Sequence, residues 1–122
     1  RFIVISKPLF MLHRAPYHGY GALETLDALL VAAAFGQNPS VLFQGDGVWQ
    51  LLPSQEAQLM ARASVVAQLE ALPLYDVDDI YVDEESLTAR GLDVAQLALP
   101  VTRLKREEMA AFIAQHTPII RF

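Results

Sequence analysis

Three side chains that can exchange protons stand where the chain is expected to leave the strands of a sheet. They are His18, Asp46 and Asp83. An imidazole and a carboxylate held close together can serve as general base and general acid. Polar residues also meet at such an edge by chance, and neither a nucleophile nor a cofactor motif accompanies these three. We therefore treat His18, Asp46 and Asp83 as candidates for one pocket, either for binding or for catalysis.

Two Gly-x-Gly pairs raise the possibility of a phosphate-binding loop, "GYG" at 19–21 and "GDG" at 45–47. The loop of dinucleotide-binding folds continues as Gly-x-Gly-x-x-Gly. Here Glu24 and Gln50 occupy the third glycine position, and the chain has no Gly-Lys-Ser or Gly-Lys-Thr triplet. The sequence therefore predicts no nucleotide and no other cofactor. The glycines are better explained as residues that let the chain leave a strand sharply.

Acidic side chains are dense between residues 76 and 85, which raises the question of a calcium site. They are Asp76, Asp78, Asp79, Asp83, Glu84 and Glu85. The pattern of a calcium-binding loop fails because Ile80 and Tyr81 stand where a ligand and the turn glycine belong. A helix start explains the last three acids better, with Asp83 as its N-cap and two glutamates near its positive end. We predict no metal site.

The chain contains no cysteine, which excludes disulfides, thiolate metal ligands and a cysteine nucleophile. Fourteen acidic residues against nine Lys and Arg give a net charge of −5. Direct binding of nucleic acid needs clustered cations, so this charge disfavours it. Arg103, Lys105 and Arg106 come closest to such a cluster, but Glu107 and Glu108 follow them directly.

Hydrophobic residues make up 53% of the chain, which predicts that a partner covers part of its surface. The longest unbroken apolar run, residues 28–35, is far too short to span a membrane. No secretory signal pattern opens the chain. We therefore expect a cytoplasmic protein that does not bind membranes.

Short apolar or β-branched runs alternate with helical patterns along the chain. The runs predict strands at 2–5, 41–44, 80–82, 100–102 and 118–122, with a proline-containing loop from residue 8 to 16. Helical periodicity predicts helices at 22–35, 54–71, 84–90 and 105–115. This alternation favours an α/β fold: a single small domain over 1–122, with a mostly parallel five-stranded sheet and helices on both faces.

The stretch "FQGDGVWQLL", residues 43–52, is expected to leave the second strand at the carboxyl edge of the sheet, without forming a hairpin. Ligand and partner sites of such sheets lie at this edge. Its apolar residues Val48, Trp49, Leu51 and Leu52 are more numerous than an edge loop requires, and tryptophan is favoured at interfaces. We predict that they contact another subunit. The alternative is that Trp49 folds back into the core.

Several sequence blocks, taken in order, resemble one family. They are "APYHGYGALETLDALL", "VLFQGDGVWQLLP", "LPLYDVDDIYV" followed by "SLTARGLD", and the closing "IIRF". On these blocks the chain resembles, nearly end to end, the TusC/DsrF branch of the DsrE/F/H sulfur-relay family. The resemblance implies a small α/β fold and a place in a heterohexamer with TusB- and TusD-like sister subunits.

A function follows from this resemblance. Such a complex receives persulfide sulfur from a TusA-like protein and passes it through a TusE-like protein towards 2-thiolation of the tRNA wobble uridine. DsrF-like counterparts serve dissimilatory sulfur oxidation. The family's sulfur carrier is a cysteine just after the third strand of the TusD/DsrE-type subunit, and the matching position here is Asp83 or its neighbour.

A persulfide needs a thiolate, which a carboxylate cannot replace. The resemblance therefore implies a non-catalytic structural subunit. A small-ligand-binding or enzymatic domain that uses the strand-end pocket remains the alternative.

Overall fold

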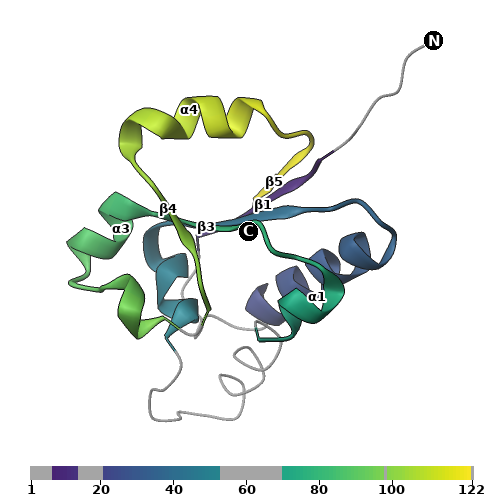
Figure 1. Cartoon of the computed structure of the whole chain (residues 1–122), viewed down its shortest axis with the longest axis horizontal. Coiled ribbons are helices and arrows are strands. Elements are labelled where there is room, and N and C mark those ends of the chain that lie inside the picture. Colours follow the sequence, from purple (N-terminus) through teal and green to yellow (C-terminus); the bar gives the residue numbers. More distant parts are fainter. Residues whose placement is uncertain (1–6, 14–20, 53–69, 98, 122) are drawn as a thin grey trace.

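The computed structural model of the chain describes residues 7–13, 21–52, 70–97 and 99–121. At its centre lies a five-stranded sheet in the order β4-β3-β2-β1-β5 (Figure 1). The strands are β1 Leu9–Leu12, β2 Ser40–Phe43, β3 Ile80–Asp83, β4 Thr102–Leu104 and β5 Ile119–Arg121. Every neighbouring pair in this order is parallel. The α/β fold with a parallel sheet, predicted from the sequence, is confirmed.

Helices lie on both faces of the sheet, also as predicted (Figure 1). They are α1 Gly21–Ala34, α3 Glu84–Ala89 and α4 Arg106–Ala114. The connecting segments also contain the short 3₁₀ helices η1 Gly45–Leu51, η2 Leu72–Tyr75 and η3 Val94–Gln96. The strand order explains this arrangement, since the chain moves from β1 to β4 in one direction and then returns past β1 to β5. Right-handed crossovers in opposite directions place their helices on opposite faces. The α4 helix, which belongs to the return, therefore covers the face opposite α1.

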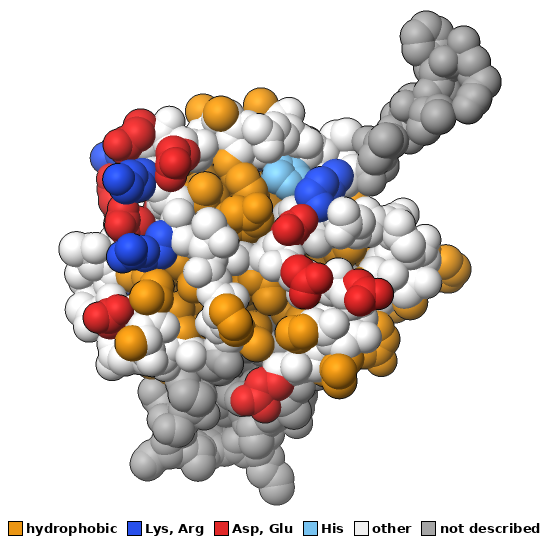
Figure 2. Space-filling model, in the orientation of Figure 1, with side chains coloured by type: hydrophobic (Ala, Val, Ile, Leu, Met, Phe, Trp, Pro, Cys, Tyr) orange, Lys and Arg blue, Asp and Glu red, His pale blue; other side chains and the backbone are white. Residues whose placement is uncertain are grey.

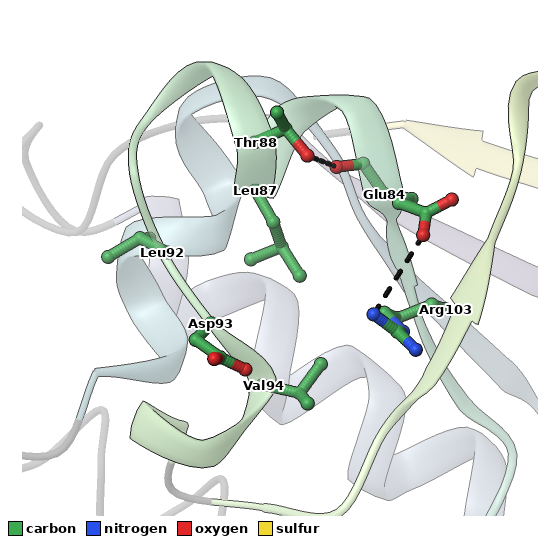
Figure 3. A pocket seen from close by; sticks show the side chains of 7 residues that line it. All are labelled: Glu84, Leu87, Thr88, Leu92, Asp93, Val94 and Arg103. Carbon is green, nitrogen blue, oxygen red and sulfur yellow. Dashed lines mark hydrogen bonds and ion pairs between the residues drawn. The ribbon is translucent and has the colours of Figure 1, made fainter.

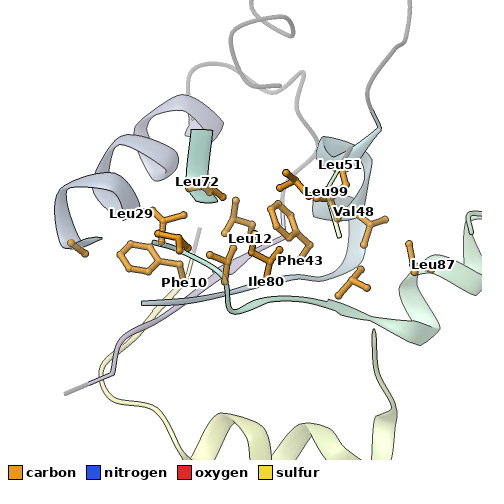
Figure 4. Packing of buried hydrophobic residues seen from close by; sticks show 14 residues of the cluster. Phe10, Leu12, Leu29, Phe43, Val48, Leu51, Leu72, Ile80, Leu87 and Leu99 are labelled. Carbon is orange, nitrogen blue, oxygen red and sulfur yellow. The ribbon is translucent and has the colours of Figure 1, made fainter. Parts of the chain in front are cut away.

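Successive strand residues point into two apolar clusters, one on each face of the sheet. Leu12 of β1 belongs to the larger cluster, together with Leu29 of α1 and Leu87 of α3 (Figure 4). Met11, the preceding residue, belongs to the smaller cluster, together with Phe112 of α4. This alternation is the ordinary consequence of strand geometry, in which neighbouring side chains leave opposite faces.

A buried histidine ties α4 to the sheet. The Nδ1 atom of His116 lies 2.8 Å from the carbonyl oxygen of Phe112, and its Nε2 atom lies 2.9 Å from the hydroxyl of Ser40. Because a carbonyl can only accept, Nδ1–H donates to Phe112, and Nε2 shares a hydrogen bond with the Ser40 hydroxyl, which can donate or accept. Both Ser40 and His116 are buried. The contact fixes the end of α4 against the first residue of β2.

The position of the first strand was not predicted correctly. The sequence was expected to form a loop from residue 8, but Leu9–Leu12 is a strand in which all four residues are buried. Pro8 directly precedes this strand, a position that proline tolerates in a sheet. The strand expected at 2–5 lies outside the described residues.

The remaining elements agree with the prediction to within one or two residues. The largest shift is that of β4, which begins at Thr102 and not at Pro100, because proline has no N–H to donate to a neighbouring strand. Most of the helix expected at 54–71 lies outside the described residues.

Candidate functional site

The carboxyl ends of the parallel strands bring polar residues into one row across the sheet. The register aligns Leu12 with Phe43 and Phe43 with Val82. The residues that follow these three, namely His13, Gln44 and Asp83, therefore occupy neighbouring positions, with roughly 5 Å between adjacent strands. The amide of Gln44 donates to the carbonyl of Leu12, which extends the pairing into this row.

Two consecutive hydrogen bonds link Asp83 through Ser86 to Gly45. The Ser86 hydroxyl donates to Asp83 Oδ2 at 2.6 Å and accepts from the amide of Gly45 at 2.8 Å. Asp83 stands at the N-cap of α3, as predicted, but its carboxylate contacts the Ser86 side chain and caps no amide of the described helix. Ser86 is buried. These two hydrogen bonds thus join the start of α3 to the exit of β2.

Asp46 is engaged in an ion pair across the same junction. Arg90 donates to its Oδ1 atom from Nη2 at 2.9 Å and from Nε at 3.2 Å, while Nη1 donates to the carbonyl of Ser86 at 3.1 Å. The Asp46 side chain is 61% exposed, so the pair contributes about 1 kcal/mol at most. Asp46 and Asp83 therefore reach the same edge, each with a partner from this chain. His18, the third predicted member, lies outside the described residues.

The sheet reverses its strand order between β1 and β5, and sequence reasoning missed the residues at this point. His13 directly follows β1, and Arg121 ends β5. In open α/β sheets ligands bind beside the carboxyl ends of the strands at such a reversal. The sequence does contain a pattern that indicates this site, namely a polar residue directly after the apolar run Leu9–Leu12. It was not recognised because the first strand was expected at 2–5.

The surroundings of His13 affect both its hydrogen bonding and its pKa. Its Nε2 atom is buried and finds no hydrogen-bond partner among the residues that the structure describes. Burial first, and then the positive charge of Arg121, lower the pKa of His13 from its ordinary value of 6.5. At neutral pH the imidazole is therefore uncharged and can accept or donate a single hydrogen bond on each nitrogen.

The glycines of "GDG" serve packing. A Cβ atom on Gly47 would lie 2.0 Å from the carbonyl oxygen of Leu12, so η1 can only rest against the end of β1 if this residue has no side chain. Gly45 has a φ of 56°, a left-handed conformation that glycine adopts easily. The expectation that these glycines let the chain leave the strand sharply is confirmed for Gly45.

The predicted contact surface at 48–52 is largely core. Val48 and Leu51 have no exposed surface, and Leu52 is 9% exposed. The turns of η1 point Val48 and Leu51 into the larger apolar cluster, where they cannot reach a sister subunit. The interface prediction is therefore wrong for Val48 and Leu51. The Leu52 side chain offers little exposed surface for such a contact. Trp49 is partly exposed and remains a candidate.

A shallow hollow of about 230 Å³ lies beside α3, between that helix, η3 and β4 (Figure 3). Leu87 and Val94 point towards its centre, and Glu84 faces Arg103 across its rim with 3.8 Å between their charged atoms. The hollow offers a weak ion pair, apolar contacts and the hydroxyl of Thr88, which donates to the carbonyl of Glu84 at 3.1 Å.

The described residues also bear on metal binding and on membrane insertion. No group of three or more His, Asp or Glu within them could hold a metal ion. Within the same residues, no helix is both long and apolar enough to cross a membrane. The buried Ser86 hydroxyl donates its proton to the Asp83 carboxylate and accepts from the amide of Gly45.

Comparison with known proteins supplies the family. Residues 7–122 match the DsrE/DsrF-like family. A protein of Pseudomonas aeruginosa called "Protein TusC homolog" is 35% identical over 117 residues, which cover 95% of this chain and 98% of that protein. A "Protein TusC homolog" of Vibrio parahaemolyticus is 32% identical over 118 residues, covering 97% and 100%.

The fold has a solved counterpart in the crystal structure of the ychN protein from E. coli. The two superpose with a TM-score of 0.80 over 96% of this chain and 99% of that one. Their sequences are 17% identical, so this likeness concerns the fold alone.

Proposed function

The chain belongs to the DsrE/DsrF-like family, and on this premise we propose that it is a non-catalytic, TusC-like structural subunit of a sulfurtransferase complex. The complex relays persulfide sulfur for 2-thiolation of the tRNA wobble uridine, and it works in the cytoplasm. Similarity over nearly the whole length to two proteins called "Protein TusC homolog" supports this role.

One observation carries the non-catalytic part of the proposal. The chain has no cysteine, and the position that the resemblance matches to the family's sulfur-carrying cysteine is Asp83, the last residue of β3, or its neighbour. The Asp83 carboxylate is bound to the Ser86 hydroxyl. A relayed persulfide requires a polarizable thiolate as its acceptor. This subunit therefore cannot hold the sulfur and contributes by building and orienting the complex.

The proposed partners are TusB- and TusD-like sister subunits, which form a heterohexamer with this chain. TusA- and TusE-like proteins deliver and accept sulfur through the complex. Direct contact of this chain with tRNA is not part of the proposal, because a net charge of −5 repels a phosphate backbone.

Native mass spectrometry of this chain, co-expressed with the TusB- and TusD-like proteins of the same genome, tests the assembly. We expect one complex with equal copies of all three chains. The chain expressed alone provides the control for its own oligomeric state. A monodisperse chain that stays apart from both sisters would contradict the proposal.

A DsrF-like role in dissimilatory sulfur oxidation is the second candidate, because the matched family bears the DsrF name as well. It needs the same structural chemistry and differs only in the pathway served. Neighbouring genes decide between the two: genes for sulfite or sulfide oxidation would favour this candidate over tRNA thiolation.

A further inference from the structure

Four large hydrophobic side chains are exposed together on the α1 side of the molecule. Phe35 is 80% exposed and Leu74 is 84% exposed, while Val31 and Tyr75 are 55% and 46% exposed. We call these four residues the docking face. Single exposed apolar side chains are ordinary in proteins, but a contiguous group of them marks a surface that binds something.

The four residues lie on two elements that pack against each other. Val31 and Phe35 lie one helical turn apart, and the amide of Phe35 donates to the carbonyl of Val31 at the end of α1. Leu74 and Tyr75 belong to η2, which packs against α1. Tyr75 and Gly36, which follows Phe35, line the same hollow of about 260 Å³. The face is thus an apolar surface with a recess beside it.

Most of the described charged residues near the docking face are acidic. Asp76 lines the same recess, Asp78 follows it along the chain, and Asp27 lies one turn before Val31; all three are exposed. Lys7, which donates to the carbonyl of Asn38 beside the recess, is paired with Asp79 at 2.6 Å. The sequence has no Lys or Arg at all from 15 to 61 or from 63 to 89. Hydrophobic and acidic side chains can be seen together over α1 and η2 in Figure 2.

We propose that the docking face binds a protein partner whose facing surface is apolar at its centre and rimmed by Lys or Arg. Burying Phe35 and Leu74 supplies the attraction, and the acidic border selects a basic rim and rejects an acidic one. The same border disfavours the anionic surface of a membrane. The inference rests on the proposed function, because it takes that partner to be one of the two sister subunits.

A second copy of this chain is a poor match for the docking face. Its described arginines mostly stand beside carboxylates: Arg90 pairs with Asp46, Arg103 with Glu84 and Arg106 with Glu85. Two docking faces placed against each other would oppose their acidic borders, and like charges across an interface weaken it. We therefore assign the complementary basic surface to a different chain.

The apolar part of the proposal is tested with the double variant Phe35→Gln and Leu74→Gln, co-expressed with both sister subunits. We expect at least a tenfold weaker association than with the wild type, measured by titrating the purified sisters into the chain. Because both side chains are exposed, thermal unfolding of the isolated variant should match that of the wild type. Ala111→Gln, exposed on α4 across the sheet, is the control and should leave association unchanged.

The electrostatic part uses Asp76→Asn and Asp78→Asn together. Asp76 has a φ of 63°, a conformation that asparagine also tolerates, so the backbone is not strained by the change. We expect weaker association at low salt and a smaller loss of affinity as salt is raised. The matched control, Glu85→Gln with Glu107→Gln, removes two exposed charges from α3 and α4 and should keep the wild-type salt dependence.

The outcomes separate the two proposals. If the wild type binds the sister subunits and both double variants bind them with the same affinity and salt dependence, the docking face is overturned and the proposed function stands. No association of the wild type with either sister would overturn both. A homo-oligomer of the isolated chain that the Phe35 and Leu74 changes disperse would assign the face to a second copy and overturn the inference.

Discussion

Asp83 shows what the last residue of β3 contributes to the fold. Its carboxylate receives the Ser86 hydroxyl at 2.6 Å. The same hydroxyl accepts a hydrogen bond from the amide of Gly45. Asp83 and Ser86 thus join the start of α3 to the exit of β2.

His13 should make stability depend on pH. Its pKa in the folded protein lies below the ordinary 6.5, because burial and then Arg121 disfavour the charged ring. The unfolded chain therefore binds more protons as the pH falls below 6.5, and the folded state loses stability there. The contribution is fully present above that pH. Replacing His13 by Gln should flatten the fall in the free energy of unfolding between about pH 7 and 5.

Urea unfolding at a series of pH values measures this difference, and an NMR titration of the imidazole gives the pKa directly. His18 and His116 are present in both proteins, so their effects cancel in the comparison. A His13 resonance that titrates at 6.5 or above would contradict the account, as would an unchanged pH dependence in the variant.

At the scale of elements, the packing of η1 on β1 depends on one missing side chain. Gly47→Ala would place a methyl group 2.0 Å from the carbonyl oxygen of Leu12, and a backbone atom cannot move aside without disturbing the β1–β2 pairing. We expect a loss of about 3 kcal/mol or more in the free energy of unfolding, at the upper end for overpacking. Urea unfolding measures it.

Gly36→Ala is the matched control for that substitution. Gly36 has a φ of 75°, but a Cβ atom there would meet no described atom within 4 Å. Only conformational strain remains, about 1–2 kcal/mol. A Gly47 variant as stable as the Gly36 variant would show that η1 can shift away from β1 freely.

Elements with strong local patterns could be predicted from the sequence. The helical spacing of α1 and the β-branched run of β3 gave bounds within one residue, because local periodicity dominates there. The position of β1 was not predicted, because a proline such as Pro8 is typical of a loop. In the structure the whole run Leu9–Leu12 is buried between two layers. Continuous apolar runs of this kind are typical of central parallel strands.

The site was harder to predict than the fold. Asp46 and Asp83 could be placed at the sheet edge from strand order alone, but not their partners Arg90 and Ser86, which come from the turns of α3. The burial of Val48 could not be foreseen either. Which face of a short 3₁₀ helix points inwards depends on the backbone path, and that path depends on the close contact at Gly47.

At the scale of the whole molecule, surface properties are divided between two sides. The surface over α1 and η2 carries exposed hydrophobic residues with acidic neighbours, and the edge of the sheet at β4, where α3 and α4 begin, carries arginines paired with glutamates (Figure 2). A composition of 53% hydrophobic residues predicted that a partner covers some surface, and the exposure of Phe35 and Leu74 shows where this excess lies. Such a division suits a subunit held in one orientation within a larger assembly.

The most direct test of the account is the rate of sulfur transfer from a persulfide-loaded TusA-like donor to a TusE-like acceptor. It is measured with the TusB- and TusD-like sisters alone, with this chain alone, with the sisters and this chain together, and with the sisters and the Asp83→Asn variant. The account predicts transfer that requires this chain but proceeds equally well with the variant, since Asp83 does not carry the sulfur. Transfer by this chain without its sisters, or equal rates with and without it, would contradict the account.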